Sequence, residues 1–499
     1  MSRESDRSRR GYAWHRLAGL IGGPAAAVAM LAFGAPAGMP AGAWTVAAVV
    51  ALMASWWMTE ALPLAVTALV PLALFPALGI NTLDGTASAY ADPLIFLFLG
   101  GFMLAAALER WRLGLRLALG IVRLGGSEPA RIVASVMAVT AFLSMWVSNT
   151  AAAIVMLPIG LSIIGGARAA NRWLDQRGLK AFAAALMLGI AYAASIGGMA
   201  TLIGTPPNAL FAAYVRDAYG VIVPFGRWLL VGVPVVAILL PLAWLVLTKL
   251  AFPVPRTALG RGEDSAAAGI ALPGPPSRGE WMAGAVFVLT VLCWIVLPFL
   301  RQRWPALELS DSGVAIVAAV LLFVLPVHPR RGVFVLGWRD VRRLPWNVLI
   351  LFGGGLALGE AMGRSGLADL VGESVVALGG LPPFVLVIVV SGAVVLLGEL
   401  ASNTAIAALF LPIAGAASVG IGESPLVLAL SVALAASIGF MLPVATPPNA
   451  IVFGSGLVSA AQMLRAGIIL DAVGVAVVSL AALALGAWLG DLPAPTPAE

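Results

Sequence analysis

The chain has 499 residues, of which 61% are hydrophobic and 10% are charged, and its mean hydropathy is +1.02. A soluble domain carries about 25% charged residues, so the composition excludes a soluble globular protein and predicts an all-α polytopic membrane protein. The net charge of +6 does not indicate a nucleic-acid partner, because basic residues of membrane proteins gather in short cytoplasmic loops.

Residues 1–43 form the N-terminal segment and the first predicted helix. A basic start that ends at Arg16 is followed by an apolar stretch with small residues near Ala35, which resembles a secretory signal peptide. Because many further apolar stretches follow, we expect an uncleaved first helix. We place the chain in the cytoplasmic (inner) membrane, with its N-terminus in the cytoplasm.

Eleven apolar stretches approach or exceed the roughly 20 residues that a helix needs to cross a bilayer. Two further apolar regions are too long for one crossing and short for two, and each carries Ser-Asn-Thr near its middle. We expect them to be re-entrant helical hairpins whose tips are covered by protein at membrane depth. The hairpins are predicted at 132–167 and 384–417, and the spans at about 17–37, 44–60, 62–79, 92–109, 181–204, 228–250, 281–300, 312–327, 346–363, 425–445 and 467–489.

The basic residues support this topology. With the N-terminus inside, 24 of the 29 Lys and Arg residues fall on the cytoplasmic side, as the positive-inside rule predicts. The basic residues on the outer side are only Arg216, Arg227, Arg301, Arg303 and Arg364.

Three motifs recur in the same order in the two halves of the chain. Gly100-Gly101 resembles Gly353-Gly354, and the motifs Ser-Asn-Thr and Thr-Pro-Pro-Asn each occur twice. The predicted topology makes these repeats inverted, and inverted repeats with a site at their interface are a common basis of alternating access. The predicted units are a first inverted repeat at 44–250 with a cytoplasm-facing hairpin, a cytoplasmic linker at 251–280, a second inverted repeat at 281–490 with an outward-facing hairpin, and a disordered tail at 491–499.

Each hairpin tip presents two hydroxyls and an amide directly before a strong helix former. Such a tip is a helix N-terminus, whose free N–H groups and dipole favour an anion. The tip residues are Ser148, Asn149, Thr150, Ser402, Asn403 and Thr404.

The two Thr-Pro-Pro-Asn motifs, which begin at Thr205 and Thr446, predict breaks in two membrane helices. The residue before a proline is pushed out of helical geometry, and proline donates no N–H, so carbonyl oxygens of the preceding turn are left free. Gly204 and Ala445 stand directly before the breaks, where carbonyl oxygens can approach an ion. Hard cations such as sodium favour oxygen ligands.

Basic residues are missing around these motifs, since no Lys or Arg occurs in 132–167, 181–215 or 384–464. An anion at mid-membrane is costly unless its charge is compensated. Compensation must then come from hydroxyls, amides, helix dipoles and bound cations, which favours cation-coupled anion binding. Arg131 and Arg364 are the basic residues that could instead reach inward.

Glu399 and Glu360 are acidic residues inside predicted membrane segments and are therefore functional candidates. Glu399 stands three residues before the second tip and is equally compatible with a hydrogen-bonded structural role. No metal-ligand cluster, acid pair or nucleophile–base pair is evident in the sequence, which argues against an enzyme. The apolar hairpin arms argue against an anion channel.

At these motifs the chain resembles the divalent anion:sodium symporter family of dicarboxylate, citrate and sulfate transporters. The segment Ala-Ser-Ile-Gly-Phe-Met-Leu-Pro-Val-Ala-Thr-Pro-Pro-Asn-Ala-Ile-Val at 436–452 is similar to the family's C-terminal signature. The resemblance implies a homodimer whose scaffold domains come from the early helices of each half, with transport domains that move as elevators. Ser-Asn-Thr at both tips resembles the dicarboxylate branch.

The resemblance also implies roles for individual residues, carried over by motif position. The substrate carboxylates would be bound by Ser148, Asn149, Thr150, Ser402, Asn403, Thr404, Thr446 and Pro447. One sodium site would be formed by Ser144, Ser148, Asn149 and Gly204, and the other by Gly398, Ala401, Asn403 and Ala445. Gly398 departs from the family, which can have Thr there, and predicts a weaker second site or one built from backbone oxygens.

The expected function is sodium-coupled uptake of a C4 dicarboxylate such as succinate, malate or fumarate, without enzymatic activity. Two alternatives stay open. One is a dicarboxylate exchanger, and the other is a sodium-coupled transporter of sulfate, citrate or tartrate, because the motif residues recognise an oxyanion without reading the whole ligand.

Overall fold

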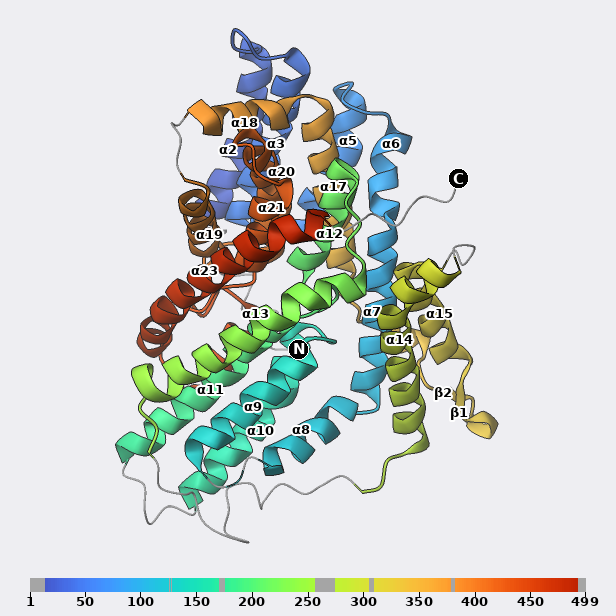
Figure 1. The fold of residues 1–499 in the computed structure, drawn as a ribbon, viewed down its shortest axis with the longest axis vertical. Coiled ribbons are helices and arrows are strands. Elements are labelled where there is room, and N and C mark those ends of the chain that lie inside the picture. Colours follow the sequence, from blue (N-terminus) through green and yellow to red (C-terminus); the bar gives the residue numbers. More distant parts are fainter. Residues whose placement is uncertain are drawn as a thin grey trace.

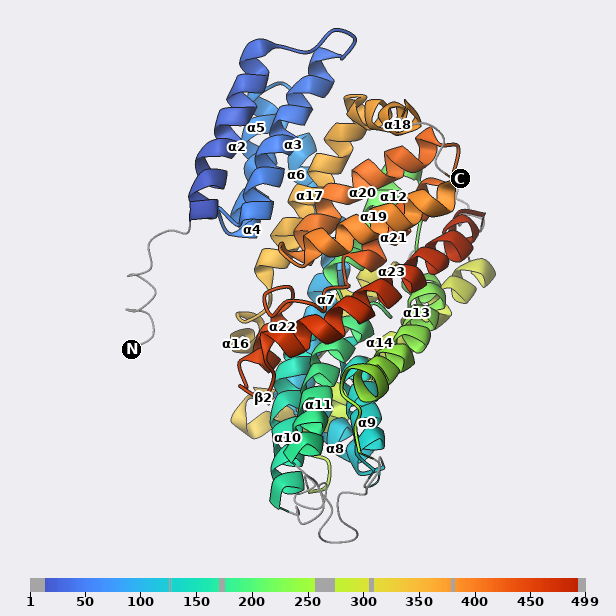
Figure 2. The same cartoon turned by 90° about the vertical axis from the view of Figure 1, so that its left-hand side faces the viewer.

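The structure is a computed structural model that describes residues 14–124, 126, 128–169, 176–255, 274–304, 309–377 and 382–491. It is an elongated bundle of helices, with the two hairpins toward opposite ends of its long axis (Figures 1 and 2). Ten helices of the described part are long and apolar enough to cross a bilayer. The all-α membrane class predicted from composition is confirmed.

The N-terminal helices pack beside one another at one end of the molecule (Figure 2). The helix Ala41–Thr59 is capped by Glu60, which adopts a left-handed conformation with φ 48°, and Pro63 precedes the next short helix. The predicted span at 62–79 is therefore two short helices in place of one long one. These elements are α2 (Trp14–Phe33), α3 (Ala41–Thr59), α4 (Leu64–Thr67), α5 (Val70–Ala77) and α6 (Leu83–Ser88).

The first half of the chain continues with the first hairpin and the first broken helix. Asp92 starts the long helix of this half, because its side chain accepts a hydrogen bond from the Leu94 backbone N–H at 2.7 Å. The elements are η1 (Ala89–Ala91), α7 (Pro93–Arg110), α8 (Leu113–Leu124), α9 (Pro129–Ser144), α10 (Asn149–Ala169), α11 (Gln176–Gly198), α12 (Pro206–Tyr219), α13 (Phe225–Leu245) and the π-helical η2 (Val246–Ala251).

The second half repeats the same order of elements. A capping box formed by Ser277 and Glu280 starts its first helix. The elements are α14 (Arg278–Arg303), α15 (Asp311–Val324), β1 (Pro326–His328), η4 (Pro329–Arg331), β2 (Val333–Phe334), α16 (Trp338–Val341), α17 (Trp346–Arg364), α18 (Leu367–Ala377), α19 (Pro383–Gly398), α20 (Asn403–Gly420), α21 (Pro425–Ala435), α22 (Pro447–Phe453) and α23 (Ala460–Asp491).

Both predicted hairpins are pairs of helices that meet at a short polar tip. The first consists of α9 and α10 around residues 145–148, and the second of α19 and α20 around residues 399–402. Pro129 and Pro383 each start the first arm, where the missing proline N–H would have no helical partner anyway. The helix–tip–helix geometry predicted from the Ser-Asn-Thr motifs is confirmed.

The predicted spans at 181–204 and 425–445 are too long. The helices end at Gly198 and Ala435, and irregular backbone follows up to the Thr-Pro-Pro-Asn motifs. Thr205 (φ −144°, ψ 141°) and Thr446 (φ −137°, ψ 149°) are extended, because each precedes a proline. The breaks are thus six or more residues long, a property that apolar composition alone does not reveal.

Two surface helices were missed by the sequence analysis. In the first half α8 follows α7, and at the corresponding place in the second half α18 follows α17. Both are short, and they interrupt the run of apolar spans. The predicted span at 312–327 also ends early, at Val324, and leads into the antiparallel pair β1–β2, whose turn ends at Gly332 with φ 62°.

The core lies where the two halves meet. Residues of α11 from Phe182 to Gly198 are all buried, and so is nearly all of α21. The Tyr192 hydroxyl of α11 donates a hydrogen bond to the Phe440 carbonyl at 2.7 Å, which ties the first half to the break after α21. Most of the linker predicted at 251–280, the residues before Trp14 and the tail after Asp491 lie outside the described residues.

Candidate functional site

The four motifs line one cavity of about 1130 Å³, which we call the motif cavity. Both hairpin tips and the starts of α12 and α22 contribute to it. Of the thirteen residues predicted for the site, Ser144 and Gly398 lie outside the lining, on the first arms of the hairpins. Those that line it are Ser148, Asn149, Thr150, Gly204, Ala401, Ser402, Asn403, Thr404, Ala445, Thr446 and Pro447.

The first tip brings three oxygen atoms unusually close together. The Ser144 hydroxyl oxygen lies 2.7 Å from Asn149 Oδ1 and 2.6 Å from the carbonyl oxygen of Ala194. Ser144 is fully buried, and a hydroxyl carries only one proton to donate. The crowded oxygens leave one contact without a proton, which is a favourable setting for a hard cation.

The first helix break is held by Asn208, the last residue of its motif. Its buried amide nitrogen lies within hydrogen-bonding distance of the carbonyl oxygens of Gly198 at 3.2 Å and Thr201 at 2.8 Å. The Thr201 hydroxyl in turn donates to the carbonyl of Met145 in the hairpin tip at 2.5 Å. The break and the tip are therefore one connected unit.

The second break repeats these contacts with Asn449. Its amide nitrogen donates to Gly439 at 2.9 Å and Leu442 at 3.0 Å, which stand ten and seven residues earlier, as Gly198 and Thr201 do before Asn208. In both copies the motif Asn thus serves to hold the break, a role that the sequence analysis did not assign.

Glu399 ties the second tip to the second break. Its two carboxylate oxygens accept hydrogen bonds from the backbone N–H groups of Met441 and Leu442, both at 2.8 Å. The side chain is 2% exposed. Of the two roles left open for Glu399, the structural one is therefore present. The hydrogen bonds of Glu399 join the second tip to the second break, as the hydrogen bond between Thr201 and Met145 does in the first half.

Asn403 offers an unused oxygen at the second tip. Its Oδ1 is buried and accepts no hydrogen bond from any described residue. A methyl group built on Gly398 would stand 3.8 Å from this oxygen and 3.8 Å from the carbonyl oxygen of Ile438. The space beside Gly398 is therefore faced by two oxygens, as a cation site would require.

A tighter space faced by two oxygens lies in the first half of the chain at Gly198, the last residue of α11. A methyl group there would lie 2.5 Å from Asn149 Oδ1 and 3.1 Å from the Gly204 carbonyl oxygen. Real Cβ atoms essentially never stand closer than 3.0 Å to such a neighbour. Only glycine fits between these two oxygens, and no sequence pattern singles out Gly198.

The two basic residues considered for the site lie elsewhere. Arg131 pairs with Glu128 at 2.9 Å on the surface, and Arg364 pairs with Glu360 at 2.5 Å beside a different cavity. Neither lines the motif cavity. The wall of the motif cavity formed by the end of α7 and the turn before α17 brings Arg110 and Arg343 instead.

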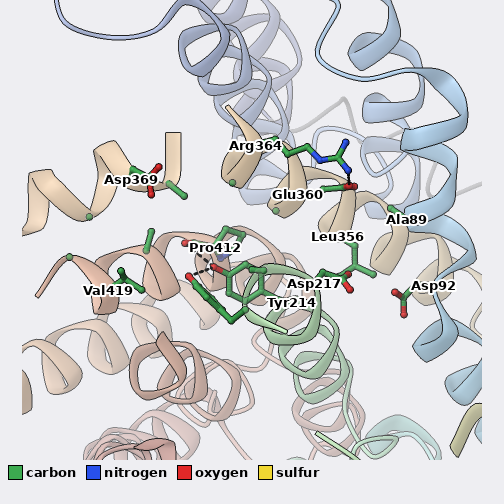
Figure 3. Close-up of a pocket in the computed structure, with 18 of the residues that line it drawn as sticks. Ala89, Asp92, Tyr214, Asp217, Leu356, Glu360, Arg364, Asp369, Pro412 and Val419 are labelled. Atoms are coloured by element: carbon green, nitrogen blue, oxygen red, sulfur yellow. Dashed lines mark hydrogen bonds and ion pairs between the residues drawn. The ribbon is translucent and has the colours of Figure 1, made fainter. Parts of the chain in front are cut away.

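The second cavity, of about 1020 Å³, is predominantly acidic (Figure 3). Tyr214 lies at its floor, with its hydroxyl 3.0 Å from that of Tyr219. Beside it Arg216, near the end of α12, forms ion pairs with Asp92 and with its neighbour Asp217. The charged residues that line this cavity are Asp92, Asp217, Glu360, Arg364, Asp369 and Glu373.

The family described as the sodium:sulfate symporter transmembrane region matches residues 14–492 of the chain. The chain belongs to this family, the divalent anion:sodium symporters. The resemblance stated from the motifs is confirmed, and it covers nearly the whole chain.

Individual relatives agree with this assignment. The chain is 40% identical over 466 residues to the sodium-dependent dicarboxylate transporter SdcS of Staphylococcus aureus strain USA300, covering 92% of this chain and 89% of SdcS. The SdcS of strain MRSA252 shows the same values.

Two solved structures share the fold at low sequence identity. The YdaH transporter of Alcanivorax borkumensis is 17% identical with a TM-score of 0.52, over 82% of this chain and 88% of that one. MtrF of Neisseria gonorrhoeae is 16% identical with a TM-score of 0.55, over 80% and 83%.

Within this family fold, the motif cavity combines two kinds of chemistry. Hydroxyls, amides and two helix N-termini line its surface and suit an oxyanion. Oxygen-rich spaces beside Gly198 and Gly398 lie directly behind the tips and suit cations. The contribution of α7 and of the residues around the start of α17 to the cavity was missed, because the sequence identifies these helices but not the face that each turns toward the cavity.

Proposed function

We propose that the chain is a sodium-coupled symporter that takes up C4 dicarboxylates such as succinate, malate or fumarate. The observation that carries this proposal is the convergence of both Ser-Asn-Thr tips and both Thr-Pro-Pro-Asn starts on one cavity. The 40% identity to a protein described as a sodium-dependent dicarboxylate transporter supports it. Sodium ions and the dicarboxylate are both transported substrates.

The substrate carboxylates are bound by the two tips and by the start of α22. A dianion then contacts hydroxyls, amides and free N–H groups from both halves of the chain. The proposed binding residues are Ser148, Asn149, Thr150, Ser402, Asn403, Thr404, Thr446 and Pro447.

The two sodium ions lie behind the tips and compensate the substrate charge. The first is held by Ser144, Ser148, Asn149 and Gly204, and the second by Gly398, Ala401, Asn403 and Ala445. The crowded oxygens around Ser144 and the unused Oδ1 of Asn403 support these positions.

Alternating access follows from the inverted repeats and an elevator movement of the hairpins and broken helices, in a homodimer of the cytoplasmic membrane. The motif cavity opens toward the cytoplasm in this conformation. Its charged rim supports that orientation, since Arg110 and Arg343 belong to segments predicted inside, whereas Arg364 of the acidic cavity belongs to a segment predicted outside.

Reconstitution in liposomes tests the function directly. We expect uptake of labelled succinate that requires an inward sodium gradient and is inhibited by malate and fumarate. Sodium-independent uptake driven only by internal dicarboxylate would reject symport and establish an exchanger. Stronger inhibition by sulfate, citrate or tartrate than by malate would instead identify that anion as the preferred substrate.

The Gly398→Thr variant should bind sodium more tightly. An added Cβ has ordinary contacts of 3.8 Å there, and the threonine hydroxyl would supply the ligand that Ser144 supplies at the first site. We expect the half-saturating sodium concentration to fall about threefold or more, a change of about 0.7 kcal/mol. Gly398→Val, which matches the shape without the hydroxyl, is the control. An equal change in both variants would contradict the assignment.

Removing the Ser144 hydroxyl should have the opposite effect at the first site. In Ser144→Ala we expect the half-saturating sodium concentration to rise about fivefold or more, about 1 kcal/mol, because a buried oxygen ligand is lost. Ser135→Ala is the matched control on the same helix, since the Ser135 hydroxyl is exposed and bonds only to the Arg131 carbonyl. Sodium titrations of succinate uptake compare the two.

A further inference from the structure

The wall of the motif cavity formed by the end of α7 and the turn before α17 carries one arginine without an ionic partner among the described residues. Arg110 is neutralised, since it pairs with Asp340 at 2.5 Å. Arg343 lines the same cavity, is exposed, and its guanidinium has no ion pair or side-chain hydrogen bond to the described residues. It is a permanent positive charge facing a site whose own segments contain none.

The turn that carries Arg343 is well anchored. Val341 and Leu344 are buried on either side of it, and the Arg343 backbone N–H donates to the Asp340 carbonyl at 3.2 Å. The Trp346 indole N–H donates to the Val341 carbonyl at 3.2 Å. Because its neighbours face the protein interior, the Arg343 side chain is held on the cavity wall.

The other charged residues on this wall make the positive charge of Arg343 more important for binding an anion. Glu60 lines the cavity but pairs with Arg16 at 3.0 Å. Glu109 also lines it and has no ion pair among the described residues. Without the Arg343 charge, Glu109 would be left as an unopposed negative group that repels a dianion.

We propose that Arg343 captures the dicarboxylate at the cytoplasmic mouth of the cavity and sets the affinity of the inward-facing state only. Asn347, on the same wall one turn further along α17, adds an amide donor. This inference rests on the proposed function. A guanidinium suits a carboxylate because it offers paired N–H donors in a plane.

The proposal predicts an effect that depends on the side of the membrane. Arg343 lies in the turn between α16 and α17, a segment predicted on the cytoplasmic side, so it meets the substrate only when the cavity is open to that side. The inner half-saturation constant should therefore depend on Arg343, and the outer one should not. Salt should weaken the effect, because the Debye length is about 8 Å at 0.15 M ionic strength.

The experiment compares right-side-out and inverted membrane vesicles that contain the full-length protein, with labelled succinate as the probe. In Arg343→Gln we expect the half-saturating succinate concentration to rise about three- to tenfold in inverted vesicles, the range expected for one accessible charge. It should stay unchanged in right-side-out vesicles. At about 1 M salt, where the Debye length is about 3 Å, the difference should shrink.

Two further variants complete the test. Arg342→Gln is the matched control, since Arg342 is adjacent and exposed but does not line the cavity, and it should behave as the unmodified protein. Arg343→Lys should restore part of the inner affinity. An equal change on both sides, a change only on the outer side, or no change would overturn the inference. Failure of the unmodified protein to transport succinate would instead overturn the proposed function.

Discussion

Gly198→Ala should strongly reduce sodium-driven succinate uptake in a protein that still folds. The added methyl group would stand 2.5 Å from Asn149 Oδ1 and 3.1 Å from the Gly204 carbonyl oxygen, which are two of the proposed ligands of the first sodium ion. Asn149 has a short side chain and cannot move away without leaving the site. We expect uptake to fall at least about tenfold, equivalent to about 1.4 kcal/mol or more.

The control is Gly439→Ala at the corresponding place of the second break. Gly439 accepts a hydrogen bond from Asn449 as Gly198 does from Asn208, but its added methyl group would meet neighbours at 3.4–3.9 Å, which are ordinary contacts. This variant should keep most of its uptake. Size-exclusion profiles of both purified proteins verify folding, and normal sodium dependence in Gly198→Ala would refute the first site.

Glu399→Ala should both destabilise the protein and stop transport. The substitution removes the acceptors of the half-buried backbone N–H groups of Met441 and Leu442, and an unsatisfied group costs up to about 1–3 kcal/mol when it is fully buried. The loss falls on the contact that joins the second tip to the second break. We expect a lower thermal unfolding midpoint in detergent and no measurable succinate uptake in liposomes.

Glu360→Gln is the matched control, because Glu360 is the other acidic residue that the sequence named as a functional candidate. Its partner Arg364 has a side chain that is 64% exposed, and such surface pairs contribute about 0–1 kcal/mol. The unfolding midpoint should change little. If Glu399→Ala were as stable as Glu360→Gln, the hydrogen bonds to the break would not be essential for the fold.

The parts of the site that could be predicted from the sequence are those where polarity or proline interrupts an apolar background. Ser148 and Ser402 stand out in regions without charge, and Pro206 and Pro447 leave no room for a continuous helix. These local signals located both tips and both breaks. The inverted relation of the two halves and the domain boundaries stay predictions.

What could not be predicted depends on how helices are rotated and how long a break becomes. The irregular segments after Gly198 and Ala435 are as apolar as the helices before them, so hydropathy extended both spans too far. Arg343 appears in the sequence as one of several basic residues of a loop. Its place on the cavity wall depends on the burial of Val341 and Leu344, which no periodicity in that short segment reveals.

The ion pair between Arg216 and Asp92 has a consequence for the rate of the transport cycle. Arg216 lies at one end of α12, whose other end starts with the Thr205 motif, and Asp92 caps α7. Any cycle that carries α12 away from α7 must separate a guanidinium from a carboxylate that is 7% exposed, and remake the pair on return. In such a cycle the ion pair contributes to the activation barrier of turnover, and a steep temperature dependence of the maximal rate would be its signature.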